Sequence, residues 1–101
     1  MKNIINNLSK LFESRLRLGI MAILMVNDKV DFNTLKEHLN ASDGNLASHL
    51  KALEKNELIQ VDKQFVNRKP KTSYCATELG RLSFKKHIDG LNNLIQNISK
   101  D

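Results

Sequence analysis

The chain has 101 residues, of which 41% are apolar and 27% are charged, with a formal net charge of +5. The composition is ordinary for a globular protein. The length is that of one domain and leaves no room for a second. The longest apolar run, residues 18–26, is far shorter than the roughly 18 residues needed to cross a membrane, and no secretory signal begins the chain. Cys75 is the single cysteine, which excludes an intrachain disulfide and a multi-thiolate metal site. We therefore expect one cytoplasmic domain over residues 1–101.

The first 27 residues have the pattern of helical structure. Apolar residues recur at three- and four-residue steps through residue 27, and Ser14 can cap a helix that begins at the next residue. Val30 and Phe32 then alternate with polar residues, which predicts a very short strand.

A pair of helices is predicted over about residues 33–56. Asn33 is a candidate cap for the first helix, and Ser42 is a candidate cap for the second. Asn56 is a credible end for the second helix, because Asn tolerates the left-handed conformation in which helices often end. Two short helices joined by a tight link are typical of a helix-turn-helix.

The second half of the chain predicts a hairpin followed by a long helix. Residues 58–61 and 72–76 have strand character, and the polar, basic stretch between them predicts a loop, so that the hairpin, or wing, covers about residues 58–76. Thr77 can cap a terminal helix over about residues 77–99. The predicted fold class is mainly α with a small β-hairpin.

Four segments carry a resemblance to a known family. In chain order they are LFESRLRLGIMAILM, DFNTLKEHL, SDGNLASHLKALEKNELI and FVNRKPKTSYCATELGR, and together they cover about residues 10–90. They look like winged helix-turn-helix transcriptional regulators of the MarR and ArsR type, most closely the compact single-domain members. This resemblance implies N- and C-terminal dimerisation helices, double-stranded DNA as partner and a role in regulating transcription.

The third predicted helix is the candidate recognition helix. Leu46, Leu50 and Leu53 form one apolar stripe, so the opposite face is directed outward. Small and hydrogen-bonding residues near the start of such a face can approach base edges, and lysines can contact phosphates. The candidate DNA-binding residues of this helix are Ser42, Gly44, Asn45, Ala47, Ser48, His49, Lys51 and Lys55. The same residues would also fit a solvated helix face, and His49, which the resemblance puts near DNA, would also fit a structural position at the helix edge.

The predicted wing has the strongest concentration of positive charge. Lys63, Arg68, Lys69 and Lys71 lie close together in a half of the chain that has eight basic and four acidic side chains. A hairpin tip would hold these charges where they can clamp phosphates or enter a minor groove, and Pro70 would stiffen the loop. An ordinary solvated surface is the alternative.

Apolar residues near both ends of the chain suggest a homodimer. The stripe in the last helix repeats at heptad-like steps, and a second apolar group lies near the N-terminus. The resemblance implies that both meet their copies in a second subunit; the alternative is a monomer in which they pair with each other. The candidate interface residues are Ile4, Ile5, Leu8, Phe84, Ile88, Leu91, Ile95 and Ile98.

Catalytic, metal and cofactor sites find no support in the sequence. There is no Gly-rich phosphate loop and no Ser-His-Asp order, and Cys75 reads as a small packing residue. His38, His49 and His87 belong to three different predicted elements, so we expect no metal, and the metal motifs of metal-sensing ArsR proteins are absent. A small-molecule effector is doubtful, because the chain has little room for a pocket of the kind that larger MarR proteins hold.

The sequence therefore predicts a non-enzymatic, sequence-specific double-stranded DNA-binding regulator, in the form of a dimeric repressor that reads an inverted repeat. The alternative is a winged-helix module for protein–protein assembly. A basic wing together with Asn45 and Ser48 favours DNA, whereas an apolar outward face on the third helix would have favoured a protein partner.

Overall fold

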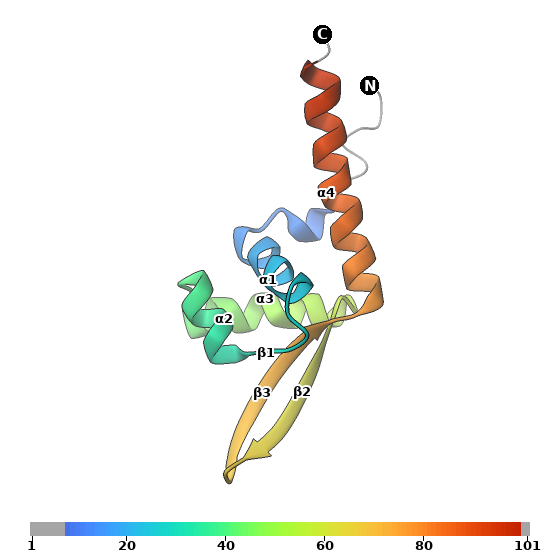
Figure 1. Cartoon of the computed structure of the whole chain (residues 1–101). Helices are drawn as coiled ribbons and strands as arrows, with labels where there is room; N and C mark the ends of the chain where they lie inside the picture. Colours follow the sequence, from blue (N-terminus) through green and yellow to red (C-terminus); the bar gives the residue numbers. More distant parts are fainter. Residues whose placement is uncertain (1–7, 100–101) are drawn as a thin grey trace.

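The computed structural model describes residues 8–99 and has four helices and a three-stranded sheet in this part of the chain. After a 3₁₀ turn at Lys10–Phe12, the elements are α1 (Arg15–Met25), β1 (Val30–Asp31), α2 (Phe32–Leu39), α3 (Asp43–Lys55), β2 (Ile59–Val66), β3 (Lys69–Ala76) and α4 (Glu78–Ser99). The β2–β3 hairpin and α4 extend in opposite directions from the helical body (Figure 1), which gives the molecule its 60 × 25 × 21 Å extents. The predicted fold class is confirmed. No helix in the described part is both long and apolar enough to span a bilayer.

Serine caps start the first and third helices, as predicted. The Ser14 hydroxyl accepts a hydrogen bond from the Arg17 N–H at 3.3 Å, and the Ser42 hydroxyl accepts one from the Asn45 N–H at 3.2 Å. The predicted cap of the second helix was wrong. Asp31 holds that position, with its carboxylate accepting from the Thr34 N–H at 2.8 Å, because the extended chain ends one residue earlier than the alternation of Val30 and Phe32 indicated. Hydrogen bonding to the Thr34 side chain, and then to its backbone N–H, lowers the pKa of the Asp31 carboxyl below its usual value.

Asn56 is the C-terminal cap of α3, as predicted, but the expected left-handed conformation falls one residue later. Asn56 has an ordinary φ of −89°, and the left-handed residue is Glu57, with φ 63°. The Asn56 side chain instead donates to the Ala52 carbonyl at 2.8 Å. The same carbonyl also accepts the Asn56 backbone N–H at 3.2 Å, so the main chain and the side chain of Asn56 both bond to it at the helix end.

The hydrophobic core lies between the three short helices and one face of the sheet. The predicted stripe on α3 is buried, with at most 2% of any of its three leucines exposed. α1 and α3 pack against each other, and α2 closes the side of the core against α1. The fully buried side chains are Ile20, Met21, Leu24, Leu35, Leu46, Leu53 and Ile59.

The wing is a long regular hairpin rather than two short strands around a loop. β3 lies between β1 and β2, and it pairs with β2 along its whole length, from Ile59 opposite Ala76 to Val66 opposite Lys69. Only Asn67 and Arg68 form the turn, both in the left-handed region with φ 53° and 65°. The predicted loop over residues 62–71 was wrong, because a two-residue turn with two positive φ angles matches the twist of the paired strands and lets them continue to the tip.

Thr77 and Gly80 determine the geometry of the junction between β3 and α4. The Thr77 hydroxyl accepts from the Gly80 N–H at 2.9 Å and donates to the Glu57 carbonyl at 2.7 Å, so it caps α4 as predicted and ties the helix to the start of the hairpin. A Cβ on Gly80 would lie 2.0 Å from the Leu58 carbonyl oxygen. Only glycine permits this close crossing of α4 over the chain.

The segment before α1 packs on the first half of α4. Phe12 is buried against Phe84 and His87, in edge-to-face contacts with ring centroids 5.6 and 5.3 Å apart. His87 is only 5% exposed, and its Nδ1 accepts a hydrogen bond from the Ser9 backbone N–H at 3.0 Å. This segment therefore covers the beginning of α4, whereas the distal half of the helix extends past the body (Figure 1).

Candidate DNA-binding surface

The outward face of α3 brings together most of the residues predicted to contact DNA. Six of them are exposed along one side of the helix, namely Gly44, Asn45, Ala47, Ser48, Lys51 and Lys55. Ser42 is exposed as well, but its hydroxyl caps the helix. An ion pair of 2.8 Å between Lys36 of α2 and Asp43 of α3 joins the two helices beside this face. The face is therefore small and polar at its beginning and basic toward its end.

His49 lies at the edge of this face and is half-buried. Its Nδ1 accepts a hydrogen bond from Nε of Arg17, on α1, at 3.0 Å. Because a guanidinium only donates, the imidazole must be unprotonated at Nδ1 and carry its proton on Nε2. Arg17 therefore fixes both the orientation and the tautomer of His49, a contact between residues 32 positions apart that the sequence did not indicate.

The four basic residues of the wing lie around the hairpin tip. Arg68 is in the turn, Lys63 is on β2, and Lys69 and Lys71 are on β3. Lys71 has a long ion pair of 3.9 Å with Asp31, and within residues 8–99 the other three have no ion pair. The tip thus carries three uncompensated charges, all on exposed side chains.

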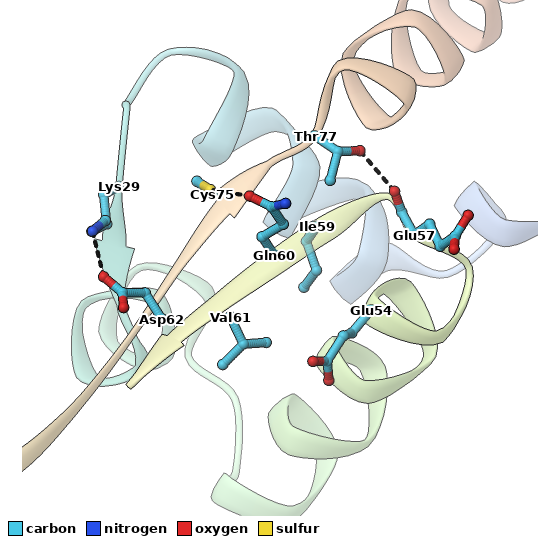
Figure 2. Close-up of a pocket in the computed structure, with 9 residues that line it drawn as sticks. All are labelled: Lys29, Glu54, Glu57, Ile59, Gln60, Val61, Asp62, Cys75 and Thr77. Carbon is cyan, nitrogen blue, oxygen red and sulfur yellow. Dashed lines mark hydrogen bonds and ion pairs between the residues drawn. The ribbon is translucent and has the colours of Figure 1, made fainter. Parts of the chain in front are cut away.

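A groove of about 700 Å³ at the base of the hairpin has the opposite character (Figure 2). Three carboxylates line it, from Glu54, Glu57 and Asp62. Lys29 bonds Asp62 at 2.6 Å, and this hydrogen bond raises the pKa of the lysine. The lining of the groove therefore carries more negative than positive charge, in contrast to the basic wing tip.

The proposed interface residues of α4 are divided between covered and exposed positions. Phe84 packs on the core, Leu91 is half-buried, and Ile88 and Ile95 are 37% and 64% exposed. At the other end, Leu8 is half-buried. The predictions for Ile4 and Ile5, and for the side chain of Ile98, fall outside the described residues.

Five exposed large apolar residues were not identified as such by the sequence analysis, namely Val26, Phe65, Val66, Leu79 and Leu82. Leu79 and Leu82 are 50% and 60% exposed on the side of α4 opposite the stripe, and their three-residue spacing was the available signal. Phe65 is 80% exposed near the wing tip, where the prediction of a loop concealed its place in a strand. These positions therefore lie outside the predicted interface.

Candidate metal ligands do not gather in residues 8–99. In that range no three His, Cys, Asp or Glu side chains meet in a geometry that could hold a metal ion. Cys75 is partly buried on β3, with its sulfur 3.9 Å from Oε1 of Gln60.

Comparison with known proteins shows the family of the chain. Residues 16–95 match the winged helix DNA-binding domain family. An uncharacterised protein of Methanocaldococcus jannaschii is 39% identical over 89 residues, which cover 88% of this chain and 97% of that one. The structure of a transcriptional regulator homologue from Pyrococcus horikoshii is 31% identical, covers 96% of this chain and 94% of its own, and superposes with a TM-score of 0.84.

A more distant structure has the same fold. A MarR family transcriptional regulator from Silicibacter pomeroyi is 18% identical, with a TM-score of 0.66 over 95% of this chain and 64% of that one. This family is one of DNA-binding regulators rather than enzymes, in agreement with the sequence analysis. The chain belongs to the winged helix DNA-binding domain family, and its fold is that of MarR-type transcriptional regulators.

Proposed function

We propose that this DNA-binding regulator is a sequence-specific dimeric repressor that reads an inverted repeat with α3 and the wing. The observation that carries the proposal is that one domain presents two surfaces of different chemistry, one on α3 and one on the wing. The start of α3 presents short hydrogen-bonding side chains suited to base edges, while the wing tip presents charges suited to phosphates.

Gly44 supports a close approach of DNA to α3. It is exposed, its φ is not positive, and a Cβ built on it would meet no atom within 4 Å. The fold therefore gives no reason for glycine at a helical position where alanine would be more stable. A partner surface that packs directly against the α3 backbone gives such a reason.

Asn45 and Ser48 are the proposed readers of sequence. Both are exposed and directed away from the buried leucines of α3. An asparagine amide can bind N6 and N7 of adenine together, and a serine hydroxyl can donate to or accept from any base edge. His49, held by Arg17, would offer its Nε2–H as one more donor.

The proposed dimer uses α4 from Ile88 onward. Ile88 and Ile95 expose apolar surface there, beyond the segment that Phe12 and its neighbours cover. A second copy would bury this surface and place two α3 helices about a two-fold axis. Sedimentation at micromolar concentration should give about twice 11.5 kDa, and the double substitution Ile88→Glu, Ile95→Glu should give a folded monomer. A wild-type monomer at 100 µM would exclude the dimer.

Repression follows from occupancy, because two subunits on one operator exclude other proteins from the same stretch of DNA. We infer a cytoplasmic location. The proposal needs neither a cofactor nor a small-molecule effector.

The readout is tested by comparing two kinds of variant on one duplex and on unrelated DNA. Asn45→Ala and Ser48→Ala should each cost roughly 1–3 kcal/mol on the preferred duplex and little on other sequences. Arg68→Ala with Lys69→Ala should weaken binding to every duplex and flatten the slope of log K against log salt by about 1 to 2. Equal losses on all DNA for the α3 variants would show that these residues do not read bases.

The second candidate function, a winged-helix module for protein–protein assembly, is favoured by the exposed Leu79 and Leu82 on the other side of α4. It predicts that replacing these two residues abolishes partner capture, while the α3 and wing variants do not. A sequence preference in DNA binding would decide against it as the main function.

A further inference from the structure

Phe65 is a large aromatic side chain placed where the fold does not bury it. Its ring is 80% exposed, two residues from the turn of the β2–β3 hairpin. Isolated exposed apolar residues are common on protein surfaces. Three features make the position of Phe65 informative: the face of the hairpin on which it lies, the residue opposite it on β3, and the charged side chains near it.

Phe65 lies on the face of the hairpin that is directed toward the helical body. Side chains alternate between the two faces of a strand, and Ile59 and Val61 of β2 pack on the core. Lys63 and Phe65 therefore continue that same face beyond the core, with Phe65 about 13 Å past Val61 along the strand. In Figure 1 this stretch of hairpin extends well away from α3 and the rest of the body.

Pro70 is the residue directly opposite Phe65. The pair beside a two-residue turn, Val66 and Lys69, is hydrogen-bonded, so the next pair is of the non-hydrogen-bonded kind, whose side chains lie closest together. The missing N–H of Pro70 consequently removes no bond to β2. Phe65 and Pro70 are thus an apolar cross-strand pair, and Pro70 also lines a groove with Phe32 and Asn33 at the start of α2.

The charges around this pair indicate a polyanionic occupant. Lys63 lies on the same face, Arg68 forms the turn and Lys69 follows it, all exposed and without an ion pair among residues 8–99. A protein or lipid partner would explain an exposed apolar ring. It would not explain why Lys63 shares the face of that ring and Arg68 lies in the adjacent turn, both without an ion pair among residues 8–99.

We propose that Phe65, backed by Pro70, is an apolar wedge that enters the minor groove beside the α3 half-site and partly unstacks one base step. The inference rests on the proposed function. Apolar wedges of this kind kink DNA, and pyrimidine–purine steps are the easiest to open. Phe65 would thus select deformable sequence at a place where no side chain hydrogen-bonds a base.

The test uses the full chain and its preferred duplex, with 2-aminopurine placed in turn at the adenines flanking each α3 half-site. This base brightens when it loses its stacking partners. Wild-type protein should raise the fluorescence at one position and bend the duplex, and Phe65→Ala should abolish both effects and weaken binding about tenfold. Val66→Ala is the matched control: it is in the same strand, is 43% exposed and lies on the opposite face, and it should leave both effects unchanged.

The outcomes separate the wedge from the function it rests on. If Arg68→Ala weakens binding while Phe65→Ala neither weakens it nor changes the fluorescence, the wedge is refuted and the regulator stands. A wild-type complex without brightening or bending also refutes the wedge. If wild-type protein prefers no duplex, both proposals fail together. Unchanged thermal unfolding of the Phe65→Ala protein establishes that any loss comes from the contact with DNA.

Discussion

Gly44→Ala should stabilise the free protein and weaken its binding to DNA. Gly44 is the second residue of α3, and a Cβ there meets no atom within 4 Å. Alanine is more favourable than glycine in a helix interior by up to about 1 kcal/mol, and a position in the first turn should realise roughly half of this. For a domain of about 100 residues, 0.5 kcal/mol raises the melting temperature by roughly 2–4 °C.

The same methyl group should obstruct the DNA complex. In the proposed complex the first turn of α3 packs against base edges, with no space for an added Cβ between the backbone and the groove. We expect a loss of about 1 kcal/mol or more, which is at least a fivefold higher Kd. Fluorescence anisotropy with the preferred duplex measures this affinity, and a thermal melt followed by circular dichroism at 222 nm measures the stability.

Two results would refute this reasoning separately. A less stable Gly44→Ala protein would mean that the space around α3 is not open as described. A more stable protein with unchanged affinity would mean that the first turn of α3 does not approach DNA closely. Because the two effects have opposite signs, general damage to the fold cannot imitate the expected pattern.

Further variants test how the surface is supported. Gly80→Ala should destabilise by about 2 kcal/mol or more in urea unfolding, since its Cβ would lie 2.0 Å from a backbone oxygen; a neutral effect would contradict the close crossing. Asp31→Ala should cost about 0.5–2 kcal/mol as a lost cap. Because the pKa of Asp31 is lowered in the folded state, its contribution to the free energy of unfolding is present above the ordinary carboxyl pKa and is lost as the pH falls through the lowered value. Asp31→Asn should keep the cap but reduce this loss of stability at low pH. An unchanged dependence of stability on pH would contradict this reasoning. Arg17→Gln should weaken binding to the preferred duplex but not to unrelated DNA if Arg17 positions His49, and an equal loss on both would assign Arg17 to phosphate instead.

The helix-turn-helix was predictable because its signals are local. Leu46, Leu50 and Leu53 fall on one side of a single helix, and the Ser14 and Ser42 caps act within three residues of themselves. The length of the wing was not predictable in this way. Residues 62–66 are polar or exposed, and they form a strand only because residues 69–73 pair with them. Such pairing produces no alternation of apolar and polar residues in either segment, so the sequence does not reveal it.

The candidate site shows the same limit. The outward face of α3 follows from helical periodicity, so its exposed residues were identified correctly as a face. The hydrogen bond between Arg17 and His49 joins two helices and could be found only in the folded chain. The place of Phe65 on an exposed strand could not be predicted either. That strand continues to the tip because Asn67 and Arg68 form a tight turn with positive φ angles, and neither residue is the glycine that usually marks such a turn.

Selection of bound sequences from a random duplex pool tests the central claim most directly. Two α3 helices related by a two-fold axis should enter successive major grooves, so the selected site should be an inverted repeat with half-site centres about 10 base pairs, or a multiple of this, apart. A direct repeat or a single half-site would contradict the symmetric dimer. A pool that yields no consensus after repeated rounds would contradict sequence-specific regulation itself.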